Sequence, residues 1–416
     1  MQPAIPTDQI IEDLGFLWLS REALSVGPNG RLINLVRQDE RLQAFLQLLR
    51  VHRRNCLTEI GSDGLAGVPA ADFLATSLSL IGDDEPLLGV PRSDADSEPR
   101  AGAVISALCW APSGRASEAI QALSQAPAPQ ARAIAIGALG ARRTDPGAVL
   151  ASALTDPSSL VRSRAARTTG QLGRRDLVPQ LLAARDDPDP ECRFWAAWAA
   201  ARMGADAPLE TLAEIAWNNT ARAGRALDLL LRRLDAPRAN AWLRDLAAQP
   251  NRQRDLIRAT GIVGDPLYIP WLLDQMTEPS TTRLAGEAFS MITGLDLAYR
   301  DLDCKPPADF QSGPNDDPED ENVALDEDEN LPWPDPAKIG HWWVANRARF
   351  SAGTAYFLGA PKQAADWLEA LSDAFQRQRH AAALELAIRQ PDKAMFEVRA
   401  RGRLQRQMIA RARGLA

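Results

Sequence analysis

Apolar side chains recur along much of the chain at intervals of three and four residues, which is the period of an amphipathic helix. Near the N-terminus, QDERLQAFLQLLRVHRRN places Leu42, Phe45, Leu48 and Leu49 on one stripe, and PAADFLATSLSLIG follows as a second such stretch. Both stretches predict helices. The chain is therefore predicted to be all-α.

A repeat of 31 residues organises the middle of the chain. The copy DPSSLVRSRAARTTGQLGRRDLVPQLL begins at Asp156, and the copy DPDPECRFWAAWAAARMGADAPLETLA begins at Asp187. Gly173 and Gly204 occupy the same place in the two copies. Two helices of about 12 residues with short turns consume this length. Each copy therefore predicts a helix pair, in which Asp-Pro starts a helix and glycine ends one.

Weaker copies on both sides extend the array to residues 98–298, which predicts an α-solenoid of HEAT-like helix pairs. Residues 1–97 are expected to form a helical N-terminal cap. Residues 299–336 include a run with thirteen acidic residues, one lysine and six prolines, and this composition predicts a solvated linker. Residues 337–416 are predicted to be a basic helical segment.

Composition and charge narrow the classes of function. The net charge is −7 and the pI is near 5.3, so nucleic acid is an unfavoured partner. The four cysteines are widely separated and the three histidines form no metal-binding motif, so we expect neither a metal nor a cofactor. The sequence shows no secretory signal and no apolar run long enough to cross a bilayer, which predicts a cytoplasmic location without membrane contact.

The aromatic stretch HWWVANRARFSAGTAYFLGAP, residues 341–361, supplies the main candidate site. Aromatic residues at intervals of seven, from Trp343 to Phe357, fit one buried helix face, so packing explains most of them. Trp342 lies on the side away from Trp343 and, with Arg347, could instead be an exposed partner-binding anchor. Tyr356 in the same stretch is a further partner-binding candidate.

Two further groups of residues have a structural and a functional interpretation. Trp195 and Trp198 share one helix face, where core packing is favoured over a partner-binding role on the concave surface. Arg132, Arg162 and Arg193 stand early in successive first helices. They are expected to form a ladder with the aspartates of adjacent turns, and a phosphate-binding groove is the alternative.

The repeat copies resemble short HEAT repeats of the kind first associated with phycobilisome lyases. VRSRAARTTGQLG and LVPQLL fit that pattern, with an early arginine, a glycine near the end of the first helix and a proline in the second. The resemblance implies an elongated array of helix pairs.

A resemblance to a bacterial family of HEAT-repeat proteins of similar length, often encoded near type VI secretion genes, rests on other stretches. These are QDERLQAFLQLLR, LAGEAFSMITGLDL, LPWPDP, WWVANRARFSAGTAYFLGAP and RQRHAAALELA. The chain departs from the family at Phe45 and Gln47, which replace a histidine and an aspartate. The resemblance implies a cytoplasmic accessory of contractile secretion and no particular catalytic residue.

A non-enzymatic protein-binding scaffold or adaptor is therefore the favoured function, with a secretion effector or spike component as its implied partner. A cytoplasmic immunity protein that neutralises a toxin is one alternative. The other is a HEAT-like enzyme that recognises DNA bases, which needs an aspartate beside exposed aromatic side chains on a cationic face.

Overall fold

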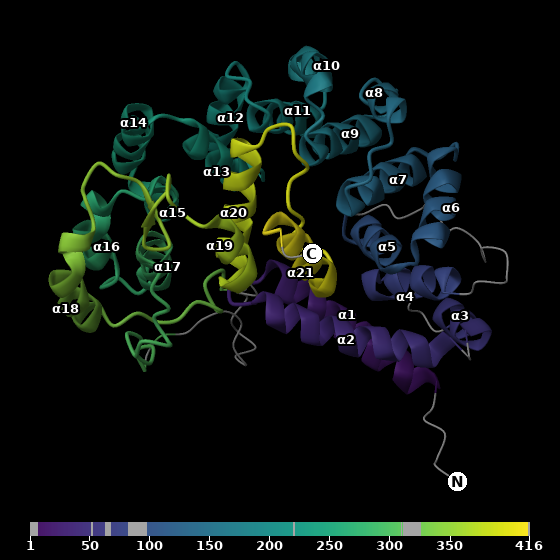
Figure 1. Cartoon of the computed structure of the whole chain (residues 1–416), viewed down its shortest axis with the longest axis horizontal. Helices are drawn as coiled ribbons and strands as arrows, with labels where there is room; N and C mark the ends of the chain where they lie inside the picture. Colours follow the sequence, from purple (N-terminus) through teal and green to yellow (C-terminus); the bar gives the residue numbers. More distant parts are fainter. Residues whose placement is uncertain are drawn as a thin grey trace, which may run out of the picture. The chain divides into compact units, whose positions relative to one another are not determined.

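A computed structural model of the chain describes residues 7–50, 53–62, 68–81, 98–218, 221–308, 310 and 326–414. The described residues form an α-solenoid of helix pairs, in which the two-residue strands β1 and β2 are the only strands (Figure 1). The chain divides into two compact units. Unit 1 comprises Met1–Glu214 and Trp367–Ala416, and unit 2 comprises Ile215–Asp366. These boundaries differ from those expected from the sequence, because the last fifty residues return to unit 1.

Unit 1 begins with helices that precede the repeats and continues with the repeat pairs. The helices of its first part are α1 (Thr7–Val26), α2 (Leu32–Leu49), α3 (Arg53–Ser62), α4 (Pro69–Leu80), α5 (Glu98–Trp110), α6 (Ser113–Ser124), α7 (Pro129–Arg142), α8 (Ala148–Ala153), α9 (Ser159–Leu172), α10 (Val178–Ala183), α11 (Pro190–Arg202) and α12 (Pro208–Trp217). Its returning part contributes α19 (Trp367–Asp373), α20 (Gln376–Arg389) and α21 (Gly402–Ala412).

The helices of unit 2 are α13 (Ala223–Arg233), α14 (Ala236–Ala247), α15 (Gln253–Val263), α16 (Ile269–Gln275), α17 (Thr282–Thr293) and α18 (Pro336–Asn346). Short 3₁₀ turns flank several helices of both units: Arg175–Leu177, Ala184–Asp186, Pro250–Arg252, Pro266–Tyr268 and Arg347–Arg349. An antiparallel hairpin of β1 (Tyr356–Phe357) and β2 (Ala360–Pro361) completes unit 2.

The repeat boundaries arise from local chemistry, with one difference from the sequence prediction. Helix α9 ends at Gly173 in the left-handed conformation (φ 72°), as glycine permits. The Asp189 carboxylate accepts a hydrogen bond from the Cys192 N–H (3.0 Å) and caps α11, and Pro190 follows in the first turn. Asp187, which was expected to be that cap, instead accepts a bond from the Asp189 N–H (3.0 Å). The repeat aspartates Asp156 and Asp187 therefore shape the turn before the helix.

The core of unit 1 starts at its N-terminal helices. Trp18 of α1 stacks on Phe73 of α4 with ring centroids 5.0 Å apart, and Phe73 meets Trp110 of α5 edge to face. Leu42 and Leu49 of α2 are fully buried, but Leu48 is 50% exposed. The stripe expected on α2 is therefore wrong at Leu48, because the buried face of the helix runs through Leu42, Leu46 and Leu49.

Helices α20 and α21 pack on α1 and α2, so the two ends of the sequence complete the same unit (Figure 1). The Gly402 N–H donates to the Asp39 carboxylate (2.6 Å), which also accepts from Arg21 Nε (3.1 Å). Fully buried Arg379 donates from Nε to the Leu371 carbonyl (2.8 Å), and burial lowers its pKa to about 10. The segment expected to be a basic tail is therefore partly built into the core.

Each unit contains one extended segment that crosses the ends of repeat helices. In unit 1 this is residues 391–397, hereafter strap 1: the Met395 N–H donates to the Gln171 carbonyl (2.8 Å) near the end of α9. In unit 2 it is residues 351–361, hereafter strap 2: the Tyr356 N–H donates to the Gly264 carbonyl (2.8 Å) just after α15. Both straps supply partners to backbone carbonyls that a helix end leaves unpaired.

The segment expected to be a solvated linker is packed onto unit 2 at both ends. Asp328 is only 5% exposed and is held by Arg254 of α15 (2.8 Å). The Asp335 N–H donates to the Leu302 carbonyl (2.8 Å), so the chain before α18 lies against the chain after α17. The half-buried Arg254 thus balances the charge of the buried Asp328. The central acidic run, residues 311–325, lies outside the described residues.

Candidate binding site

Trp195 and Trp198 belong to the core of unit 1. Their rings are 4% and 8% exposed and meet edge to face with centroids 5.6 Å apart. Trp195 Nε1 donates to Glu191 (3.2 Å), and Arg167 lies 4.7 Å from the Trp195 ring centroid. Core packing is therefore the correct interpretation, and the partner-binding role considered for these two residues is corrected by their burial.

The aromatic stretch around α18 is also mainly core. Trp342 is partly buried and meets Phe289 of α17 edge to face at 5.9 Å. Tyr356 is 5% exposed, and its hydroxyl accepts a hydrogen bond from the Ser351 N–H (3.0 Å). Tyr356 is therefore covered by the protein itself, whereas the half-buried Trp342 packs on the core of unit 2 and its partner-binding role stays a prediction. Of that stretch, the candidate Arg347 is exposed.

The helical interpretation of the same stretch is wrong in its extent. Helix α18 ends at Asn346, whose side-chain amide donates to the Trp342 carbonyl (2.8 Å). Phe350 follows in extended conformation and Phe357 lies in β1, and both are buried. Burial of these rings was predicted correctly. Their spacing of seven reflects a helix, a turn and a hairpin that share one core.

The repeat arginines form the expected ladder in unit 1. Arg132 pairs with Asp156 (3.1 Å) and Arg162 pairs with Asp187 (2.7 Å), each reaching the turn of the next repeat. The hydrogen bond from Arg162 holds the pKa of the Asp187 carboxyl below its usual range, although burial opposes this. The groove interpretation is therefore corrected for Arg132 and Arg162, whose charges are neutralised within the array.

The ladder has no third rung of this kind. Arg193 donates to the carbonyls of Asp187 (2.7 Å) and Pro188 (3.1 Å) of its own turn. The rungs join residues 24 and 25 apart, and Trp217 and Asn218 stand at those distances from Arg193. A tryptophan and an asparagine therefore replace the carboxylate where the next rung is expected.

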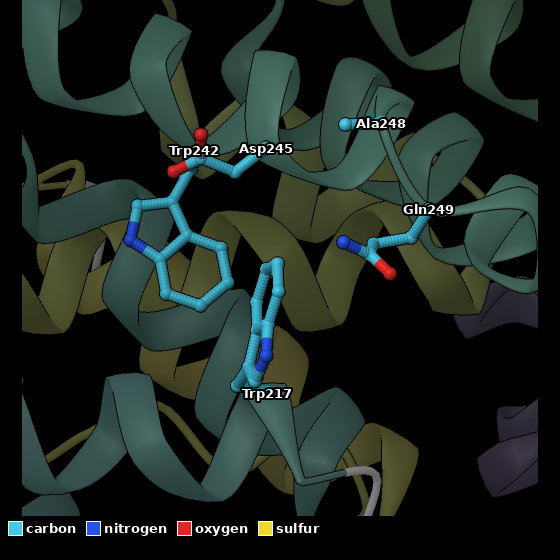
Figure 2. A pocket seen from close by; sticks show the side chains of 5 residues that line it. All are labelled: Trp217, Trp242, Asp245, Ala248 and Gln249. Atoms are coloured by element: carbon cyan, nitrogen blue, oxygen red, sulfur yellow. The ribbon is translucent and has the colours of Figure 1, made fainter.

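A surface hollow of about 360 Å³ lies beside that tryptophan in unit 2. It is lined by Trp217, Trp242, Asp245, Ala248 and Gln249. The two indole rings meet edge to face with centroids 5.6 Å apart, at an interplanar angle of 74°. Figure 2 shows the rings facing the open space, with the Gln249 side chain extending toward Trp217. We call this feature the tryptophan hollow.

Local structure positions both indole rings. Trp217 is the last residue of α12, where its carbonyl accepts a hydrogen bond from Arg252 (2.7 Å). Arg252 also lies 5.7 Å from the Trp217 ring centroid and pairs with Asp255. Trp242 is on α14 at the edge of a buried stripe that includes Leu243 and Leu246, so it is only partly covered. Two tryptophan side chains on helices therefore form the hollow, and Arg252 of the same chain holds one of them, Trp217, in place.

The polar groups of the tryptophan hollow are available to a ligand. Asp245 is exposed and makes no ion pair or hydrogen bond within the part of the chain that the structure describes. The indole N–H groups of Trp217 and Trp242 likewise have no acceptor among the described residues. A carboxylate, an amide and two indole N–H donors thus border an apolar surface, as in many small binding sites.

The sequence pattern does not single out the residues of this hollow. Trp217 and Trp242 lie in weak copies or at copy boundaries, where the 31-residue pattern gives no register. One signal was present: Trp242 and Asp245 are three residues apart, which places them side by side on an amphipathic helix. The contribution of Trp217 depends on its ring contact with Trp242, which spacing alone does not reveal.

Within the described ranges, no group of three or more histidine, cysteine, aspartate or glutamate side chains could hold a metal ion. Nor does any helix among them combine the length and apolar character that a membrane span requires. No disulfide joins any of the four cysteines, and Cys56 and Cys192 are buried.

Comparisons with known proteins locate the repeats. A family model for HEAT repeats matches residues 147–227, which cover α8 to α12 and the start of α13. Searches of curated proteins and of solved structures found no match. The chain therefore contains HEAT repeats, and its helical architecture agrees with them.

Proposed function

We propose that this protein is a non-enzymatic scaffold that binds a protein partner, and that the tryptophan hollow is part of its contact surface. HEAT repeats commonly serve as protein-interaction scaffolds, and the matched residues 147–227 include Trp217. The single observation that carries the proposal is the pair of incompletely buried tryptophans that face the same hollow.

Energetics favour a partner contact at this pair. Tryptophan buries about 150–250 Å² when covered and is enriched among the residues that dominate interface binding energy. Trp217 is 38% exposed even though an arginine lies over its ring. Covering both indoles with a partner surface would remove apolar area from water at about 25 cal/mol per Å².

The finer roles follow from the family resemblance and belong to the same proposal. An adaptor would carry a type VI secretion effector or spike component without altering its activity. An immunity protein would inhibit the toxin that it binds. The purified partner distinguishes the two, since its activity persists in the first complex and is lost in the second.

A base-recognising enzyme is the second candidate, favoured by one specific observation. The tryptophan hollow brings Asp245 beside two accessible indole rings, which is part of what that function needs. Incubation with duplex DNA that carries an alkylated purine decides the question. Release of the base that is lost in Asp245→Asn would establish the enzyme and remove the scaffold proposal.

The scaffold is tested by affinity purification from the native cell, with quantitative mass spectrometry. We expect the double variant Trp217→Ala/Trp242→Ala to lose at least tenfold of a partner that wild type retains, equivalent to about 1.4 kcal/mol. Tyr299→Ala is the matched control, because Tyr299 is an 81% exposed aromatic of unit 2 outside the hollow. Equal retention by the double variant and wild type would remove the hollow from the interface.

A further inference from the structure

Arginine over tryptophan is a recurrent contact within this protein. The guanidinium carbon lies 4.6 Å from the ring centroid for Arg401 over Trp110, and 5.1 Å for Arg389 over Trp367. At the tryptophan hollow, Arg252 over Trp217 adds an ion pair with Asp255 to the same contact. A cation over an indole face is attracted by the ring quadrupole, and a nearby carboxylate strengthens the arrangement.

Trp242, like Trp217, has a carboxylate nearby, but it has no cation over its ring. Its ring meets Trp217 edge to face, and no arginine or lysine of the described chain lies over it. Asp245 follows three residues later on α14, so its carboxylate stands on the same side of the helix as the indole. The hollow thus contains an indole face, an unpaired carboxylate and the Gln249 amide, which complement one positive planar group.

We propose that the tryptophan hollow receives an arginine side chain of the protein partner, an inference that rests on the proposed function. The guanidinium stacks on Trp242 and donates N–H groups to the Asp245 carboxylate, and the Gln249 amide oxygen accepts a further N–H. Arginine is favoured over lysine because its planar, weakly hydrated group can stack and pair with a carboxylate together.

The size of the hollow agrees with a single side chain. Its volume of about 360 Å³ is near the lower end of the 300–1,000 Å³ range of small-molecule sites. Charge also limits the occupant. The exposed Arg244 precedes Asp245 in the sequence, and Arg252 is engaged by Asp255 and by backbone carbonyls. Asp245 is therefore the one uncommitted charge among the residues that line the hollow.

The test uses the full chain and N-acetyl-arginine methylamide as the probe, followed by the indole N–H signals in NMR spectra. Trp217→Phe and Trp242→Phe assign the two relevant signals. We expect saturable shifts of both in wild type and binding about tenfold weaker in Asp245→Asn. The citrulline analogue, which has the same shape without the charge, should shift neither signal. Equal shifts with citrulline, or shifts confined to other indoles, would overturn the proposal.

The partner assay separates this inference from the proposed function. Loss of partner from both Trp217→Ala/Trp242→Ala and Asp245→Asn supports an arginine in the hollow. Retention by Asp245→Asn together with loss from the double variant keeps the scaffold and overturns the arginine. If wild type retains no partner, the scaffold fails, and the NMR titration still decides whether the hollow recognises the guanidinium group.

Discussion

The two units hold the extended strap that crosses the ends of their repeat helices by different interactions. In unit 1, strap 1 is held mainly by side chains: Arg202 donates to the Pro391 (2.9 Å) and Lys393 carbonyls, and Arg143 donates to the Met395 carbonyl (2.5 Å). In unit 2, strap 2 is held mainly by backbone: the Leu358 N–H donates to the Met291 carbonyl (2.8 Å). Arginine side chains thus hold the strap of unit 1, whereas backbone hydrogen bonds of a hairpin hold the strap of unit 2.

The comparison shows which residues each way of holding a strap requires. Arg202 is fully buried and makes no ion pair with a described residue, its Nε has no hydrogen-bond partner among them, and burial lowers its pKa to about 10, although Asp392 acts in the opposite direction. A charged group is thus kept in the core to hold two backbone carbonyls of strap 1. Strap 2 also relies on one buried charge, since the Asp265 carboxylate (5% exposed) accepts from the Gly353 N–H (3.1 Å). Its hairpin needs glycine at Gly264 and Gly294, where a Cβ would meet the hairpin backbone. The straps share that second requirement, since both cross a glycine at a helix end.

Glycine substitution should have the largest effect and tests whether the straps are equally rigid. A Cβ at Gly173 would lie 2.5 Å from the Lys393 carbonyl oxygen, and a Cβ at Gly264 would overlap the Tyr356 carbonyl oxygen. We expect Gly173→Ala and Gly264→Ala each to lower the free energy of unfolding by about 3 kcal/mol, from left-handed strain plus displaced chain. Chemical denaturation measures the loss, and hydrogen exchange identifies the unit that loosens.

Gly204→Ala is the matched control for backbone strain alone. Gly204 also has positive φ (104°), but a Cβ there meets no atom within 4 Å. Its substitution should cost about 1 kcal/mol. If Gly204→Ala lowers the free energy of unfolding as much as Gly173→Ala and Gly264→Ala do, the straps move away from the added Cβ at no measurable cost in stability.

Removing the guanidinium of Arg202 should have a smaller effect that is confined to unit 1. Arg202→Met keeps the apolar stem and removes the donors to the Pro391 and Lys393 carbonyls of strap 1. We expect a loss of about 2 kcal/mol, with faster hydrogen exchange over residues 391–397 and unchanged exchange over strap 2. Arg185→Met, at a position with a 65% exposed side chain, is the control. Unchanged exchange in strap 1 would show that its backbone contacts suffice.

The smallest effect concerns the Arg–Asp ladder, and it depends on pH. The hydrogen bond from Arg162 lowers the pKa of Asp187 in the folded state below the ordinary value of about 4. The rung therefore stabilises unit 1 above that value, and its contribution disappears as pH falls through the lower folded pKa. Asp187→Asn should cost about 1 kcal/mol at pH 7 and progressively less below pH 4. A pH-independent cost, or an equal cost in exposed Asp186→Asn, would contradict the assignment.

Local patterns predicted the repeats well, because their determinants lie within one copy. The 31-residue spacing located the helices α9 to α12, the ends at Gly173 and Gly204, and the pairs Arg132–Asp156 and Arg162–Asp187. Each of these features depends on residues at most 25 positions apart. An internal repeat also shows the same signal twice, which makes the register secure.

The candidate site could not be predicted in the same way, because exposure depends on distant segments. Trp342 and Tyr356 are covered by α17 and by neighbouring chain, and nothing in their own spacing reveals that cover. Trp217 and Trp242 look no different in sequence from Trp195 and Trp198, yet the first pair faces a hollow and the second pair is buried. Aromatic identity predicts a large contact area, and tertiary packing decides whether the protein itself supplies the contact.

The discontinuous composition of unit 1 has a consequence for biosynthesis. Residues 215–366, which form all of unit 2, leave the ribosome before residues 367–414, which cover α1 and α2. Until translation passes Gly402, the Asp39 carboxylate lacks its backbone donor on α21, and the apolar faces of the first helices lack their cover. Unit 2 can thus fold on the nascent chain while unit 1 is still incomplete. The uncovered apolar faces of the first helices are a surface of the kind that chaperones bind.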